Sequence, residues 1–246
     1  WGFSFGVEIG GKLNGAKMWQ KNQDKIDPYI CYLRDKGLAE TYVNDFKARE
    51  FQDAFASPLE DEDYIDNWIG RSGLEMLKNA PKDRSWFIQV NFAGPHNPLN
   101  ATKKMLDRWT DVTSFPPPYN STRFTDKENL QIRQNYSAMI ENIDSWIPRF
   151  LEEVERRGEL ENTIIIFASD HGDMLGDHNR VAKSVPFQGA VNVPLIIAGF
   201  SIKYTPPITK PVGLIDLFAT ILDIAGIPCP NGVDSVSLKQ IGRAHV

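Results

Sequence analysis

Three short, continuous runs of apolar residues constrain the fold of this chain more than any other feature. They cover residues 86–92, 163–168 and 193–198. Each run is rich in β-branched or aromatic residues and is bounded by turn-forming residues, as is typical of a buried β-strand. Long amphipathic segments lie between them. We therefore predict an α/β fold in which a mixed, largely parallel sheet is sandwiched by helices.

The segments between these runs have the apolar spacing of helices. Residues 64–77 place their apolar side chains on one helical face, and residues 130–154 repeat that pattern over a longer stretch. Pro148 lies inside the second pattern, so we expect the helix to kink or restart there, and Gly158 to end it. Residues 214–225 predict a further amphipathic helix, closed by Gly226.

Polar residues follow the second run directly, in the sequence Ser-Asp-His-Gly. Asp170 and His171 stand where a strand ends, and ligands in open α/β folds gather outside the carboxyl ends of strands. Asp170 would give a metal ion the hard oxygen that calcium or magnesium prefers, whereas His171 is less typical for these ions. In the alternative interpretation the motif is a turn, with Gly172 at positive φ.

Two further side chains could act on an anion. Lys183 could neutralise negative charge on a metal-bound oxyanion, although a single lysine is most often a solvated surface charge. His96 lies between two prolines after the first run, and a fixed imidazole could protonate a leaving group as a general acid. A packing or capping histidine is the alternative. His178 and Arg180 are ambiguous by themselves.

Composition excludes some classes of function. The chain has 246 residues, with 27 Lys and Arg against 32 Asp and Glu, which gives a net charge of −5. This balance does not favour nucleic-acid binding, which normally needs a basic surface. The apolar runs are too short to cross a bilayer, so we expect no membrane span. Cys31 and Cys229 are too few for a disulfide framework.

The motifs occur in an order that resembles the sulfatase family of the alkaline-phosphatase superfamily. The run Phe-Ile-Gln-Val-Asn-Phe-Ala-Gly-Pro-His-Asn-Pro, which contains His96, is similar to the family's F-x-V-x-F-x-x-P-H-x-P segment. Asn-Thr-Ile-Ile-Ile-Phe-Ala-Ser-Asp-His-Gly, Lys183 and Asn-Val-Pro-Leu-Ile-Ile follow in the family's order. The resemblance covers about residues 86–238, as the later part of the catalytic domain. Residues 1–85 fit loosely, as a variable helical and loop region.

The resemblance implies hydrolysis of sulfate esters, of a sulfated carbohydrate or small molecule. Asp170 and His171 would bind Ca²⁺, with Mg²⁺ as the alternative. Lys183 would hold the sulfate oxygens, and His96 would protonate the departing alcohol. We also predict that His178 and Arg180 contact the substrate. The family's nucleophile is a formylglycine, made from the cysteine of a C-x-P-x-R or C-x-A-x-R motif.

The chain departs from the family pattern in several places. Neither Cys31 nor Cys229 stands in the formylglycine motif, and the family's early Asp-Asp pair has no counterpart. We therefore expect a domain truncated at both ends, inactive alone and marginally stable, with residues 239–246 foreign to it. No signal peptide is visible; a periplasmic or secreted location is compatible with the resemblance, and the oligomeric state cannot be read.

Two other functions stay open on these residues. A phosphoryl or phosphonate ester hydrolase of the same superfamily would use related metal geometry. A non-catalytic relative would keep the scaffold and bind an anion.

Overall fold

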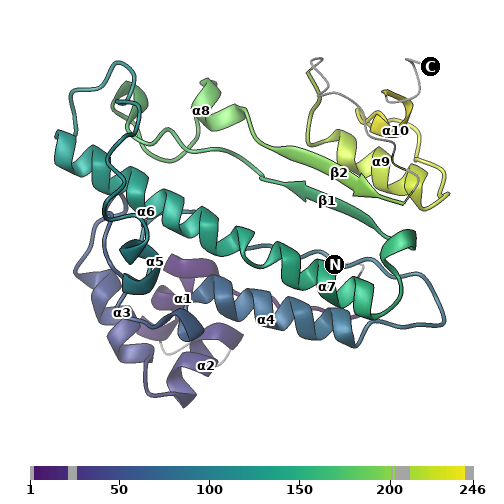
Figure 1. Cartoon of the computed structure of the whole chain (residues 1–246), viewed down its shortest axis with the longest axis horizontal. Helices are drawn as coiled ribbons and strands as arrows, with labels where there is room; N and C mark the ends of the chain where they lie inside the picture. Colours follow the sequence, from purple (N-terminus) through teal and green to yellow (C-terminus); the bar gives the residue numbers. More distant parts are fainter. Residues whose placement is uncertain (1–2, 22–26, 201, 203–210, 242–246) are drawn as a thin grey trace. The chain divides into compact units, whose positions relative to one another are not determined.

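The computed structural model describes residues 3–21, 27–200, 202 and 211–241 of the chain. These residues form two compact units, each built from two stretches of sequence (Figure 1). Unit 1 comprises Trp1–Thr163 and His171–Val193, and unit 2 comprises Ile164–Asp170 and Pro194–Val246, as far as these ranges are described. The predicted boundaries at residues 85 and 238 concern family segments and stay predictions. Residues 242–246 of the predicted foreign terminus lie outside the described residues.

Unit 1 is helical in its described parts. Its helices are α1 (Gly11–Gln20), α2 (Pro28–Asp35), α3 (Ala39–Lys47), α4 (Ile65–Lys78), α5 (Lys103–Asp107), α6 (Asp126–Asp144), α7 (Ile147–Arg156) and α8 (Gln188–Val191). Unit 2 contains the strands β1 (Ile164–Ala168) and β2 (Leu195–Gly199) and the helices α9 (Asp216–Ile224) and α10 (Leu238–Ile241). No described helix combines the length and the apolar composition that a membrane span requires.

Local sequence signals explain where several of these helices begin. The Asp27 side chain caps α2 by accepting from the Ile30 N–H at 2.9 Å. Thr125 and Glu128 form a capping box at the start of α6. Such caps satisfy main-chain donors that the first helical turn leaves without partners.

The core of unit 1 is rich in aromatic side chains. Tyr29, Tyr42 and Tyr64 are almost completely buried. The rings of Tyr29 and Tyr42 meet edge to face, with their centroids 5.8 Å apart. The phenol groups find main-chain acceptors: Tyr29 donates to the Asp63 carbonyl at 2.8 Å, and Tyr42 donates to the Lys12 carbonyl at 3.0 Å. The second bond ties α1 to α3.

The helix predicted over residues 130–154 is present as two helices. α6 ends at Asp144 and α7 begins at Ile147, with Pro148 in its first turn, where proline is tolerated. Gly158 follows α7 at a φ of 73°. The predicted restart at Pro148 and the stop at Gly158 are confirmed. The helices predicted over residues 64–77 and 214–225 are also present, as α4 and α9.

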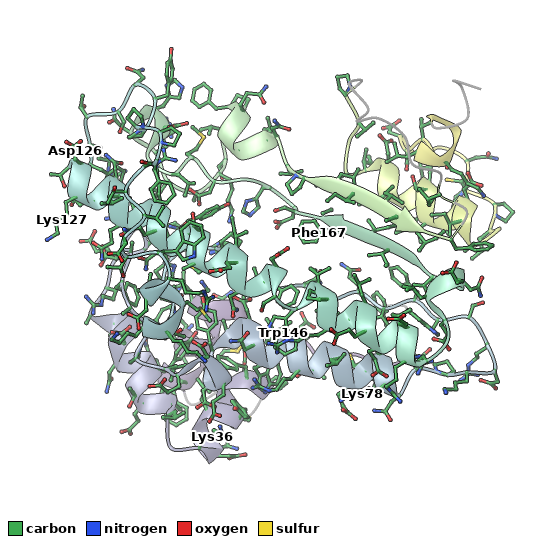
Figure 2. All side chains as sticks on the ribbon, in the orientation of Figure 1. Lys36, Lys78, Asp126, Lys127, Trp146 and Phe167 are labelled. Carbon is green, nitrogen blue, oxygen red and sulfur yellow. The ribbon has the colours of Figure 1, made fainter. Side chains whose placement is uncertain are left out.

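The junction of α6 and α7 packs against α4 through Trp146, which is labelled in Figure 2. The indole N–H donates to Asn67 Oδ1 at 2.7 Å. A Cβ atom on Gly70 would come within 2.3 Å of the indole ring. Glycine is therefore required at this position of α4 for the close approach.

The sheet of unit 2 corrects the predicted topology. β1 and β2 are confirmed as strands, but they pair antiparallel, with Ile164 opposite Gly199 and Ala168 opposite Leu195. None of their residues is fully buried, and Phe167 and Ile196 are exposed. An apolar run indicates a strand that can be covered on both faces, but it encodes neither the direction of its neighbour nor the presence of a cover. The predicted largely parallel sheet is thus wrong for the described residues.

Residues 86–92 are not assigned to a strand, contrary to prediction. Their exposure nevertheless alternates: Trp86, Ile88, Val90 and Phe92 are half-buried, and the residues between them are exposed. This alternation is typical of an extended segment that packs one side against a core. Val90 and Phe92 pack on the core of unit 1. In the described part of the chain, no strand forms a ladder of hydrogen bonds with residues 86–92.

Candidate functional site

The loop that contains His96 begins where the extended segment 86–92 ends. A buried lysine, Lys12, donates hydrogen bonds to two main-chain carbonyls of this loop. Lys12 of α1 is only 4% exposed. Its ammonium group donates to the main-chain carbonyl of His96 at 2.8 Å and to that of Pro98 at 3.3 Å. Burial lowers the pKa of Lys12 to about 8, although the nearby Asp66 carboxylate acts in the opposite direction.

Asp66 of α4 binds the start of the same loop. Its Oδ1 atom accepts from the main-chain N–H groups of Ala93 at 2.7 Å and Gly94 at 2.9 Å. The Oδ2 atom is buried without a hydrogen-bond partner in the described part of the chain. Burial raises the pKa of Asp66. One buried cation and one buried anion therefore fix the His96 loop from two helices.

His96 and Lys183 meet, as their predicted shared role requires. Lys183 Nζ lies 2.7 Å from His96 Nε2, and His96 Nδ1 lies 2.7 Å from the carbonyl oxygen of Asn97. Because a carbonyl can only accept, Nδ1 holds the proton of the neutral ring, and Nε2 accepts from the Lys183 ammonium. This assignment follows from the hydrogen-bond partners.

The surroundings of His96 favour its neutral form. Burial is the main cause that lowers its pKa, and the positive charges of Lys183 and Lys12 act in the same direction. Phe51 packs edge-on against the imidazole, with ring centroids 5.9 Å apart. A bound anion would oppose these causes, because negative charge near an imidazole stabilises its cation.

The segment between His171 and Lys183 folds back on itself, which brings Lys183 to His96. The Met174 N–H donates to the Ala182 carbonyl at 2.9 Å, and the Gly176 N–H donates to the Arg180 carbonyl at 2.8 Å. Asp173 closes the base of this loop, since its Oδ1 accepts from the N–H groups of Leu175 at 2.9 Å and Ala182 at 3.0 Å. Burial raises the pKa of Asp173.

The predicted metal ligands, Asp170 and His171, directly precede this loop in the sequence. His171 faces His96, with ring centroids 6.3 Å apart, and its Nδ1 lies 2.8 Å from the Gly172 carbonyl oxygen. That contact assigns the proton to Nδ1 and the lone pair to Nε2, the form in which histidine binds metals. Asp170, the residue before His171, is the last residue of the first stretch of unit 2.

These residues alone do not make up a calcium site. Across the described ranges, no three His, Cys, Asp or Glu side chains gather in a way that could hold a metal ion. Calcium takes about six to eight oxygen ligands. That Asp170 and His171 bind a metal ion stays a prediction, and a calcium site would need further ligands that the described residues do not bring together.

The remaining predicted residues lie on the same loop but away from the His96–Lys183 contact in sequence. His178 is half-buried and packs against Tyr119 and Phe187. Arg180 is exposed, and its described hydrogen bonds are made by its main chain. Their predicted contacts with substrate stay predictions.

Sequence reasoning missed Lys12, Asp66 and Asp173. A single lysine in a polar helix carries no sign that it will be buried. Asp66 gave a weak signal, because an acidic residue beside the apolar face of a predicted helix can turn inward. Asp173 directly follows the Asp-His-Gly motif, and a short polar side chain there commonly bonds main-chain N–H groups of its own turn.

Comparison with known proteins identifies the family to which this chain is similar. The sequence matches the sulfatase family over residues 14–227. An arylsulfatase of Clostridium perfringens is 30% identical over 198 residues, which are 71% of this chain and 41% of that protein. The chain thus spans less than half the length of this relative.

Solved structures show the same fold. A phosphonate monoester hydrolase of Agrobacterium radiobacter aligns with a TM-score of 0.71 and 20% identity, over 88% of this chain and 50% of that one. A protein solved with its substrate D-glucosamine-2-N,6-O-disulfate aligns with a TM-score of 0.65 and 20% identity, over 72% of this chain and 52% of that one. The match over most of the sequence, together with the order of its motifs, shows that this chain belongs to the sulfatase family.

Proposed function

We propose that the natural protein containing this chain hydrolyses sulfate esters, with His96 and Lys183 acting on one bound sulfate group. The observation that carries the proposal is the 2.7 Å contact between Lys183 Nζ and His96 Nε2. It brings a cation and an imidazole nitrogen to one point, although the two residues are far apart in the sequence.

The chemistry of the pair follows from charge. Lys183 binds the negatively charged sulfate oxygens, and the bound anion raises the pKa of His96, which burial and neighbouring cations keep low in its absence. When the Lys183 ammonium turns from Nε2 to the sulfate oxygens, Nε2 takes up a proton from solvent and delivers it to the departing alcohol oxygen as a general acid. Lys12 and Asp66 hold the loop in position for this transfer.

The nucleophile and much of the metal site come from elsewhere in this proposal. Cys31 and Cys229 stand outside the formylglycine motif, and the described residues do not complete a calcium site. We propose that Asp170 and His171 contribute two ligands to a Ca²⁺ site, with Mg²⁺ as the alternative ion. The formylglycine and the other ligands then belong to residues outside this chain.

The substrate is proposed to be a sulfated carbohydrate or small molecule. One structural relative was solved with D-glucosamine-2-N,6-O-disulfate, and one sequence relative is an arylsulfatase. The likeness to a phosphonate monoester hydrolase supports a second candidate, hydrolysis of phosphonate monoesters.

Steady-state kinetics of the purified natural protein distinguish these candidates. We expect a higher kcat/KM for p-nitrophenyl sulfate than for p-nitrophenyl phenylphosphonate. Lys183→Ala should lower kcat by about 10²–10³-fold, the usual cost of removing one donor that stabilises an oxyanion. The exposed Lys127, labelled in Figure 2, gives the matched control Lys127→Ala, which should keep full activity.

Each other result points to a different function. Preference for the phosphonate ester would establish the second candidate. Binding of sulfate esters without turnover of either substrate would indicate a non-catalytic anion-binding relative.

A further inference from the structure

Three ring side chains, from the loop before α6 and from both sides of Lys183 in the sequence, form a cluster. The Tyr119 ring meets the His178 ring edge to face, with centroids 5.2 Å apart and an interplanar angle of 71°. His178 in turn stacks on Phe187, with centroids 4.4 Å apart and an angle of 20°. Tyr119 is 70% exposed and Phe187 is 39% exposed. These three residues are called the ring cluster below.

Main-chain hydrogen bonds fix the ring cluster in place. The Tyr119 N–H donates to Asp177 Oδ1 at 2.7 Å, and the His178 N–H donates to the Tyr119 carbonyl at 2.9 Å. Asn179 Oδ1 accepts from the N–H groups of Thr122 at 2.7 Å and Arg123 at 2.8 Å. The loop before α6 is thereby joined to the loop before Lys183, so the rings are held before any ligand arrives.

The backbone at this junction is in a conformation that side chains other than glycine rarely adopt. His178 has a φ of 52° and Asn179 a φ of 60°. Histidine and asparagine adopt this left-handed conformation more often than other residues with a side chain, but it remains uncommon, and such residues concentrate at ligand-binding positions. The His178 ring contacts both other rings of the cluster.

Two residues of the ring cluster, His178 and Phe187, lie near Lys183 in the sequence. Because residues 174 and 182 pair at the base of the loop, His178 lies at its tip, four residues from Ala182. Phe187 follows Lys183 by four residues. Four residues of fully extended chain span at most about 14 Å, so the Cα atom of His178 lies within this distance of that of Ala182, and the Cα atom of Phe187 within this distance of that of Lys183.

We propose that Tyr119, His178 and Phe187 form a stacking surface for a ring in the alcohol part of the substrate. The inference rests on the proposed function, because it takes the sulfate to be held at Lys183. Aromatic faces bind flat apolar ring faces, which both an aryl group and a pyranose present. The substrate class is therefore a sulfate ester whose alcohol contains a ring, and the ring cluster determines specificity.

A purely structural role fits the exposure of Tyr119 less well. A ring that stabilises a loop by packing contributes mainly through the apolar surface that it removes from water. Tyr119 leaves most of its surface in solvent. Its main-chain contacts with Asp177 and His178 would also remain if the ring were removed.

The test compares three esters with the natural protein: p-nitrophenyl sulfate, glucosamine 6-sulfate and an unbranched alkyl sulfate without a ring. Tyr119→Ala should lower kcat/KM for a ring-containing ester by about 3–10-fold, as expected for one lost stacking contact, mainly through KM. The alkyl ester should be unaffected. Tyr119→Phe keeps the ring and should restore the wild-type values. Phe5 is similarly exposed, at 73%, and Phe5→Ala is the matched control.

The outcomes separate this inference from the proposed function. Loss with the aryl ester alone, or with the sugar ester alone, identifies the ring that binds and supports the proposal. An equal loss with all three esters, or no loss with any, overturns it while sulfate-ester hydrolysis stands. If the wild type hydrolyses none of them, the proposed function fails, and the same comparison of dissociation constants by calorimetry still decides whether the rings bind.

Discussion

Lys12 shows how much a single buried charge can contribute to a site that it does not enter. Its ammonium group is enclosed by unit 1 and bonds two carbonyls of the His96 loop. Its neighbours in this environment are Asp66, the His96 ring and the Tyr64 ring, whose centroid lies 5.9 Å from Nζ. Replacing a whole buried ion pair by apolar residues can be neutral for stability, so a role in positioning the loop is the better reason to bury Lys12 beside Asp66.

The lowered pKa of Lys12 predicts a pH dependence of stability. Its pKa is about 8 in the folded protein against an ordinary value of 10.5, so between these values the unfolded chain binds more protons. Stability therefore rises with pH across this window, by at most about 3 kcal/mol from this group. Urea unfolding of the wild type and Lys12→Met at pH 7.5 and 10 measures the effect, which the variant should lose.

Lys17 gives the control for this measurement, because it lies on the same helix and is exposed. Lys17→Met should keep the wild-type dependence on pH. The same dependence in Lys12→Met as in the wild type would show that the ammonium group is solvated.

The sequence allowed some of these residues to be identified, but not others. His96 and Lys183 were found because they stand in motifs with a fixed order, and their side chains are in contact in the structure. Lys12 and Asp66 stand in no motif, and whether a charge is buried depends on the packing of distant segments. The contacts of Lys12 and Asp66 with the His96 loop could therefore not be predicted from the sequences of α1 and α4 alone.

At the scale of elements, the close packing of α4 on Trp146 is the most sensitive contact. A Cβ atom on Gly70 would lie 2.3 Å from Trp146 Cδ2, closer than atoms can approach. Gly70→Ala must therefore displace the indole from its hydrogen bond with Asn67. We expect it to lower the free energy of unfolding by about 1–3 kcal/mol, as overpacked cores do.

Thermal unfolding measures this change, with Gly6→Ala as the control. No atom lies within 4 Å of a Cβ atom built on Gly6. An unchanged melting temperature in Gly70→Ala would mean that the helices separate at no cost, which contradicts the described packing.

The positions of the helices and strands were easier to predict from the sequence than the pairing of the strands. The helical periods of α4, α6 with α7, and α9 were clear, and Pro148 and Gly158 indicated their ends because proline and glycine restrict the backbone locally. Strand direction was not predictable, because β1 and β2 pair through main-chain groups that every residue has. Residues 86–92 show the same limit. Their sequence indicates an extended segment, but it does not indicate whether another strand pairs with that segment.

At the scale of the whole molecule, the chain spans only part of the length of its sulfatase relatives. It spans 41% of an arylsulfatase relative, and its cysteines lack the formylglycine context. The 246-residue chain alone should therefore release no measurable sulfate from p-nitrophenyl sulfate. Release that also disappears in Lys183→Ala would show that the chain contains a nucleophile of another kind.

The central claim is that His96 gives a proton to the alcohol that leaves the sulfate held by Lys183. The most direct test is the dependence of the His96→Ala defect on the leaving group in the natural protein. An alkyl sulfate needs a proton on its leaving oxygen, whereas p-nitrophenolate departs without one. We predict a loss in kcat of about 10²–10⁴-fold for the alkyl ester and a loss within about tenfold for the aryl ester. Equal losses with both esters would contradict the assignment of His96 as the proton donor.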